Sequence, residues 1–229
     1  MKTIGIIGGM SWESSLAYYR IVNETVKARR GGYHSADCLL YSLDFHAVEQ
    51  KQASGDWEGL GAMMADAAQR LERGGAACVV LATNTMHRLA DHITDAVDIP
   101  LLHIADATAL RVRAADVKRV GLLGTRFTME GDFYAGRLRE QGLEVMVPDE
   151  AGRERVHQVI YDELVLGEIN ADSRQAYVDI MAQMAQHGAQ GVILGCTEIG
   201  LLIQQQHTPL PTFDTTRIHA EHAVDFALG

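Results

Sequence analysis

The chain alternates short apolar runs with longer segments that mix apolar and polar residues. The apolar runs are rich in Val, Ile and Leu and predict strands at residues 3–7, 36–43, 76–81, 100–104, 119–124, 143–148, 191–194 and 210–213. Helix-like stretches lie between most of them, such as 13–28, 57–73, 86–97, 128–141, 171–187 and 215–228. Apolar strands that are separated by helices indicate parallel sheets covered on both faces, so the sequence predicts an α/β fold.

The same pattern occurs twice along the chain. The run "IGIIGG" from Ile4 resembles "VGLLGT" from Val120, and "GAACVVLATN" from Gly75 resembles "GAQGVILGCT" from Gly188. A third match, "IPL" and "TPL", follows in the same order. Three ordered matches with nearly constant offsets indicate an internal duplication.

The duplication predicts two pseudo-symmetric lobes, each with a mainly parallel sheet flanked by helices, and an active site in the cleft between them. We expect residues 1–98 plus 210–229 to form the first lobe and residues 99–209 to form the second. Ligands of open α/β sheets bind at the carboxyl ends of the strands. In the aligned repeats Thr83 falls on Cys196, so these two residues are predicted to flank one ligand.

The loops after the strands offer several groups for binding a small acid. The segments "TNT" (83–85) and "CTE" (196–198) carry hydroxyls and an amide at predicted helix starts, where free backbone N–H groups attract carboxylates. The segment "GTRFT" (124–128) adds two hydroxyls, and "GGMSWE" (8–13) adds two glycines and Ser11. Each of these residues could instead serve only to cap a helix or to form a tight turn.

Cys196 differs from the other two cysteines. Cys38 and Cys78 lie within predicted strands, as expected of small buried hydrophobic residues. Cys196 follows its strand at a predicted helix N-terminus, a setting that is expected to lower the pKa of a thiol. From this context alone, Cys196 fits both an active thiol and a structural residue.

Composition excludes several classes of function. The formal net charge of -10, with no cluster of Lys and Arg, argues against nucleic-acid and anionic-membrane partners. Three widely spaced cysteines without a CxxC motif argue against disulfides and structural zinc, and they favour the cytoplasm. Motifs for dinucleotides, nucleotide phosphates, catalytic zinc and a serine nucleophile are absent. His87 and His103 lie near strand ends and could reach the cleft, but no metal site is expected.

The segments "IGIIGGMSW", "ATNTMH", "GLLGT" and "GCTEIG" together resemble the cofactor-independent aspartate/glutamate racemases. The resemblance runs nearly end to end and includes "HIADA" (103–107) and "FDTT" (213–216). It implies two pseudo-symmetric lobes that hold an amino acid between two cysteines, with no pyridoxal phosphate and no metal. It also implies a homodimer.

The chain departs from this family pattern at one position, because Thr83 stands where the first catalytic cysteine is usual. It thereby resembles an atypical branch, described as L-aspartate/glutamate-specific or as broad-specificity amino-acid racemases. The resemblance implies Cys196 on one face of the substrate Cα and Thr83 on the other, with unequal efficiency because a hydroxyl is a poorer base than a thiolate. The implied substrate contacts are Met10, Ser11, Asn84, Thr85, Thr125 and Thr197, with Glu198 near the thiol.

Two other functions fit the same residues. One is a decarboxylase or isomerase of the same superfamily, in which a single cysteine protonates one face of an enolate. The other is a non-catalytic binder of small acids that has kept the carboxylate-binding loops but lost one base.

Overall fold

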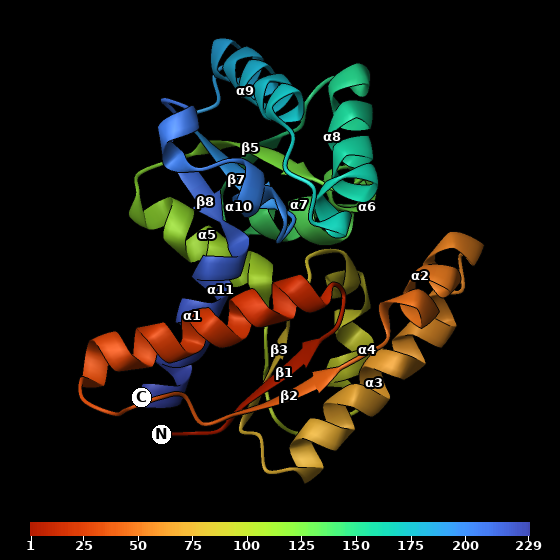
Figure 1. The fold of residues 1–229 in the computed structure, drawn as a ribbon, viewed down its shortest axis with the longest axis vertical. Helices are drawn as coiled ribbons and strands as arrows, with labels where there is room; N and C mark the ends of the chain where they lie inside the picture. Colours follow the sequence, from red (N-terminus) through yellow and green to blue (C-terminus); the bar gives the residue numbers. More distant parts are fainter. The chain divides into compact units, whose positions relative to one another are not determined.

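A computed structural model describes residues 1–229. The chain forms two compact units, and the first comprises Met1–Ile104 together with His219–Gly229. The second unit is the continuous segment Ala105–Ile218. The chain therefore passes from one unit to the other twice, and its last helix ends in the unit where the chain began (Figure 1).

Each unit is built on one parallel sheet of four strands. The first sheet has the order β2-β1-β3-β4, with strands β1 (Ile4–Gly8), β2 (Cys38–Ser42), β3 (Cys78–Leu81) and β4 (Leu101–Leu102). The second has the order β6-β5-β7-β8, with strands β5 (Arg119–Gly124), β6 (Glu144–Met146), β7 (Gly191–Gly195) and β8 (Thr212–Asp214). The two sheets have the same strand order, and the predicted α/β class is confirmed.

Helices cover these sheets. Those of the first unit are α1 (Trp12–Arg30), α2 (Phe45–Ser54), α3 (Trp57–Arg73), the 3-10 helix η1 (Thr85–Leu89), α4 (Ala90–Thr94) and most of α11 (Thr215–Leu228). Those of the second are α5 (Ile104–Ala114), α6 (Arg126–Glu130), α7 (Asp132–Glu140), α8 (Glu150–Asp162), η2 (Leu164–Leu166), α9 (Ala171–Gln186), α10 (Ile199–Leu202) and η3 (Gln205–His207). None of the helices combines the length and the apolar character needed to cross a bilayer.

The strands are apolar on both faces because both faces are covered. In β1, Ile4 and Ile6 pack in one cluster with residues of α1 and α11, whereas Ile7 packs in a second cluster with residues of α3. In the second unit, Val192 and Leu194 of β7 pack against α8 and α9. Burying one such aliphatic side chain contributes about 1.5–3 kcal/mol, so these layers hold the strand ends in place.

The boundaries of the units differ from those expected from the sequence. Strand β4 was expected in the second lobe, but Val79 of β3 pairs with Leu101 in the first sheet. Strand β8 was expected in the first lobe, but Ile193 of β7 pairs with Phe213 in the second sheet. Each repeat thus keeps its own fourth strand, and only α11 from His219 onward returns to the first unit.

Two predicted helices are interrupted. The segment expected as one helix at 86–97 begins as the 3-10 helix η1 and continues as the single short helix α4. The segment expected at 128–141 divides at Gly131, whose extended backbone separates α6 from α7. Both interrupted segments follow a strand, β3 or β5, whose loop carries predicted site residues.

Candidate active site

The loops after β3 and β7 occupy equivalent positions in the two sheets. Ile7 of β1 pairs with Leu81 of β3, and in the second sheet Leu123 of β5 pairs with Leu194 of β7. Thr83 lies two residues beyond Leu81, and Cys196 lies two residues beyond Leu194. The pairing register thus gives the two side chains the same place in their units.

In the first unit, the loop after β1 is held by serine hydroxyls. Ser11 caps α1, because its Oγ accepts a hydrogen bond from the backbone N–H of Ser14 at 3.2 Å. The N–H of Gly9 donates to the Oγ of Ser15 at 2.7 Å. Gly9 has a φ of +91°, and a Cβ there would lie 2.1 Å from the carbonyl oxygen of Leu43. Only glycine fits this turn, which sets Met10 and Ser11 at the carboxyl end of β1.

The loop after β3 is buried and tied to the residues that follow it. Thr83 is 8% exposed, and Asn84 and Thr85 are also buried. The backbone carbonyl of Thr83 accepts a hydrogen bond from Nδ1 of His87 at 2.7 Å. The His87 Nε2 accepts in turn from the N–H of Ile104 at 3.2 Å, so both ring nitrogens hold backbone groups.

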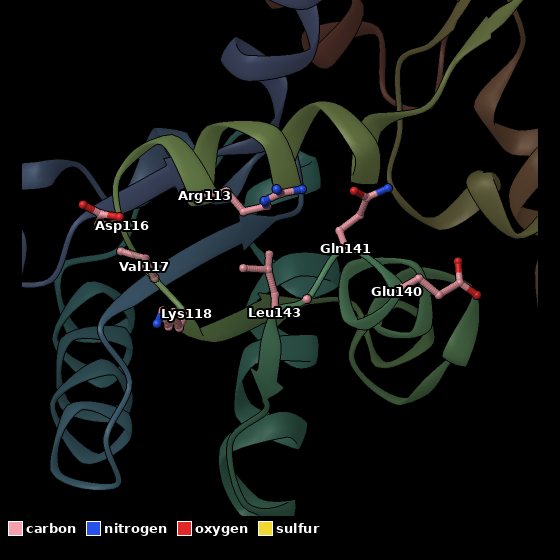
Figure 2. Close-up of a pocket in the computed structure, with 8 residues that line it drawn as sticks. Arg113, Asp116, Val117, Lys118, Glu140, Gln141 and Leu143 are labelled. Carbon is pink, nitrogen blue, oxygen red and sulfur yellow. The ribbon is translucent and has the colours of Figure 1, made fainter.

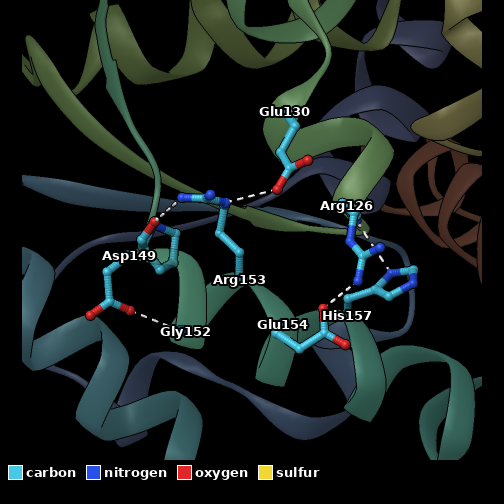
Figure 3. A network of polar contacts seen from close by, with 8 residues as sticks. Arg126, Glu130, Asp149, Gly152, Arg153, Glu154 and His157 are labelled. Carbon is cyan, nitrogen blue, oxygen red and sulfur yellow. Dashed lines mark hydrogen bonds and ion pairs between the residues drawn. The ribbon is translucent and has the colours of Figure 1, made fainter.

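In the second unit, Thr125 follows β5 and caps α6, because its Oγ1 accepts from the N–H of Thr128 at 3.3 Å. The next residue, Arg126, forms an ion pair with Glu154 of α8 through its guanidinium, and its backbone N–H donates to His157 Nδ1 (Figure 3). Since these charged groups are about half exposed, they position α6 beside α8 more than they stabilise the unit.

The loop after β7 brings a thiol, a hydroxyl and a carboxylate together. The Sγ of Cys196 donates to Oε2 of Glu198 at 2.9 Å, and the Oγ1 of Thr197 donates to the same oxygen at 2.7 Å. Cys196 is partly buried and Glu198 is 4% exposed. Both hydrogen bonds therefore form largely away from water.

This arrangement reverses one expectation from the sequence. The pKa of the Cys196 thiol lies well above its ordinary value, because burial disfavours the thiolate and the Glu198 carboxylate repels it and binds the S–H form. The expected net lowering of the pKa at the helix start is wrong, because the lowering by the backbone N–H groups of Glu198 and Ile199 is outweighed by burial and by the Glu198 carboxylate. Cys196 therefore holds its proton in the resting protein.

The structure places the nine predicted site residues at four strand ends. Five lie at the carboxyl ends of β1 and β3 in the first unit: Met10, Ser11, Thr83, Asn84 and Thr85. Four lie at the carboxyl ends of β5 and β7 in the second: Thr125, Cys196, Thr197 and Glu198. As expected, Cys38 and Cys78 lie within strands, and burial raises the pKa of Cys78 to about 11.

One feature of the first unit was not found from the sequence. His219 of α11 is fully buried and lies against Tyr18 and His87. These residues are far apart along the chain, and no short motif connects them. No group of three or more His, Cys, Asp or Glu side chains is placed to hold a metal ion.

A hollow of about 510 Å³ lies elsewhere in the second unit, lined by residues 113, 116–118 and 140–143 (Figure 2). These residues immediately precede β5 and β6, so the hollow lies at the amino ends of the strands. It contains none of the predicted site residues. The loops at the opposite, carboxyl ends of the strands carry the candidate chemistry.

Comparison with known proteins assigns the chain to a class of protein. The family model described as Asp/Glu/Hydantoin racemase matches residues 7–223, so the chain belongs to this family of isomerases. The predicted membership of the aspartate/glutamate racemase family is thereby confirmed.

Particular relatives agree with this assignment. The chain is 51% identical to a protein from Yersinia pestis whose crystal structure is described as that of a candidate Asp/Glu racemase, with a TM-score of 0.94 and all of both chains covered. It is 36% identical to an aspartate racemase homologue from Pyrococcus horikoshii OT3, with a TM-score of 0.88 and all of both chains covered. It is 24% identical to the broad specificity amino-acid racemase RacX from Bacillus subtilis (strain 168), over 99% of this chain and 98% of that protein.

Proposed function

We propose that this protein racemises an amino acid, aspartate or glutamate or a broader set, by removing and returning a proton at Cα. Cys196 acts on one face of that carbon and Thr83 on the other. The relatives are described as racemases of aspartate, of glutamate or of amino acids of broad specificity, which supports an amino acid as the substrate. The reaction uses side-chain acid–base chemistry and no cofactor.

The equivalent register of Thr83 and Cys196 is the observation that carries this proposal. Racemisation requires one proton-transferring group on each face of a single carbon. A duplicated unit supplies two such groups by symmetry if each repeat contributes the same loop position. The side chains two residues beyond Leu81 and Leu194 have the same loop position in their repeats, and one is a hydroxyl and the other a thiol, which supports the proposal.

Glu198 accepts the proton of the Cys196 thiol, so that the thiolate forms. The S–H proton passes to Oε2 of Glu198 along the 2.9 Å hydrogen bond, and the thiolate then takes the proton from Cα. The hydroxyl of Thr83 protonates the resulting carbanion on the opposite face. Glu198 releases its proton to solvent and Thr83 regains one, so the enzyme returns to its starting state.

The remaining site residues bind the substrate and stabilise the charge that develops. Asn84 and Thr85 in the first unit and Thr125 in the second offer hydroxyl and amide groups to the substrate carboxylate, and Thr197 joins them when its hydroxyl turns from Glu198 to the substrate. Fixed donors of this kind stabilise the carbanion, whose charge spreads onto the carboxylate. Met10 and Ser11 complete the substrate contacts on the first unit.

The difference between the Cys196 thiol and the Thr83 hydroxyl affects kcat and KM but not the ratio of kcat/KM in the two directions. Two enantiomers have equal free energies in water, so kcat/KM must be the same in both directions. The poorer acid–base group at residue 83 therefore makes kcat and KM differ separately between the two directions. A measurement of kcat/KM alone does not reveal the asymmetry.

The test is racemisation of a panel of single enantiomers, followed in both directions by chiral chromatography. We expect turnover of at least one acidic amino acid, with equal kcat/KM from either enantiomer. Cys196→Ala should abolish turnover and retain substrate affinity in calorimetry. Wild-type protein that binds the acid but does not turn it over would identify a binder, and release of carbon dioxide from a malonate-type acid would identify a decarboxylase.

A further inference from the structure

The first unit contains a buried cluster of three histidines beside the Thr83 loop. His87, His103 and His219 are 2%, 6% and 0% exposed. The ring centroids of His87 and His103 lie 4.5 Å apart, and those of His87 and His219 lie 5.7 Å apart. Imidazoles this deeply buried must have specific hydrogen-bond partners, because an unpaired buried polar group is costly.

Hydrogen bonds fix the tautomer of His87. The backbone oxygen of Thr83 can only accept, so Nδ1, at 2.7 Å, carries the ring proton. The N–H of Ile104 can only donate, so Nε2, at 3.2 Å, carries a lone pair. His87 is therefore the neutral Nδ1–H form, and its two nitrogens join the Thr83 loop to the start of α5.

His219 anchors the other side of the cluster. Its Nε2 donates to the backbone oxygen of Leu102 at 2.6 Å, and its Nδ1 accepts from the hydroxyl of Tyr18 at 2.8 Å. Leu102 ends β4, two residues before Ile104. The segment that His87 holds through Ile104 is thus itself held by α11 and, through Tyr18, by α1.

We propose that His87 is a positioning residue for Thr83. The proposal rests on the function proposed above, in which Thr83 transfers a proton at Cα. The Nδ1–H bond to the Thr83 carbonyl fixes the backbone that carries the hydroxyl. Because Thr83 is the weaker of the two acid–base groups, its proton transfer depends most on correct placement.

Two conservative substitutions separate the two bonds of His87. In His87→Asn, the amide nitrogen takes roughly the place of Nδ1 and can still donate to the Thr83 carbonyl. In His87→Gln, the amide lies roughly where Nε2 was, so it can accept from Ile104 but leaves the Thr83 carbonyl without its donor. His34→Gln, at an exposed position, is the matched control.

The readout is deuterium incorporation in D2O, because it separates the two faces of Cα. For the enantiomer whose Cα–H faces Cys196, deuterium returned without inversion requires only Cys196, whereas inversion requires Thr83 as well. We expect His87→Gln to lower inversion about 10- to 100-fold, the scale of effect when a reacting group is misplaced. We expect exchange without inversion to persist, and His87→Asn to stay near wild-type inversion.

Several outcomes would overturn this inference. Equal losses of exchange and inversion in His87→Gln would do so, as would identical behaviour of the Asn and Gln variants. If the variants do not fold, ¹⁵N-histidine NMR of the wild-type protein decides, because an Nε2–H tautomer at His87 contradicts the proposal. Wild-type protein with neither exchange nor inversion would instead refute the proposed function.

Discussion

The contact between Cys196 and Glu198 leads to a prediction in which two measured rates move in opposite directions. Glu198→Gln keeps the size of the side chain and an acceptor oxygen, but it removes the negative charge beside the thiol. Burial and, after it, the Glu198 carboxylate hold the pKa of Cys196 well above its ordinary value. Without that charge, the pKa of the thiol falls relative to the wild-type protein, and more thiolate forms at a given pH.

The two effects are large enough to measure separately. Unit charges about 4 Å apart interact by about 4 kcal/mol at an effective dielectric constant of about 20. Losing even a third of this repulsion raises the thiolate population about tenfold, since about 1.4 kcal/mol corresponds to a factor of ten. Loss of the proton acceptor should nevertheless lower kcat by roughly 10²–10⁴-fold, the usual contribution of a general acid–base group.

Iodoacetamide alkylation at pH 8, followed by peptide mass spectrometry, measures the thiolate of Cys196. Cys38 and Cys78, in strands, serve as internal references. Chiral chromatography measures racemisation in the same samples. Glu144→Gln is the control, because Glu144 is exposed and starts β6 at the amino end of the second sheet.

We expect faster alkylation of Cys196 in Glu198→Gln together with slower racemisation, and no change of either rate in Glu144→Gln. If racemisation speeds up along with alkylation, Glu198 only suppresses the thiolate and does not accept its proton. Unchanged alkylation would show that the carboxylate does not control the thiol.

Three further predictions concern the first unit. Burial and, after it, the nearby His87 lower the pKa of His219 to about 3. As the pH falls below about 6.5, His219 therefore gains a proton in the unfolded chain but not in the folded protein, which favours unfolding. Measured by urea unfolding, the free energy of unfolding of the wild-type protein should fall by about 2 kcal/mol more than that of His219→Gln between pH 7 and pH 5. Equal decreases in the two proteins would contradict the lowered pKa of His219. Gly9→Ala should lower the free energy of unfolding by about 1–3 kcal/mol more than Gly142→Ala, since both have positive φ but a Cβ at Gly142 meets nothing within 4 Å. Thr83→Cys should raise kcat and bring its values in the two directions closer together, and a lower kcat in both directions would argue against proton transfer by residue 83.

The homodimer implied by the family resemblance stays a prediction. Size-exclusion chromatography with light scattering measures it directly, with about 50 kDa expected for two chains of 25.1 kDa. A mass of one chain at all concentrations would contradict it.

Much of the architecture can be predicted from the sequence because it depends on local patterns. Apolar runs without alternation identify all eight strands, since parallel strands are covered on both faces. The repeat identifies Thr83 and Cys196 as equivalent before any register is known. It also pairs "IPL" with "TPL", the segments that lead into β4 and β8, in agreement with the place of each of these strands in the sheet of its own repeat.

The electrostatics of the site could not be predicted in the same way. Position alone predicted a lowered pKa for the Cys196 thiol, but burial of the sulfur and, after it, the side chain of Glu198 folded back onto the sulfur raise the pKa. A sequence does not specify that rotamer. Likewise, Tyr18 and His219 are 201 residues apart, so their hydrogen bond follows only from the return of α11 to the first unit.

The most direct test of the account is the position of deuterium early in the racemisation of a single enantiomer in D2O. If the thiol of residue 196 and the hydroxyl of residue 83 serve opposite faces, the product should carry solvent deuterium at Cα from the first turnovers. Product that retains the substrate's own hydrogen would mean that a single group carries the proton across, and it would contradict the two-face mechanism.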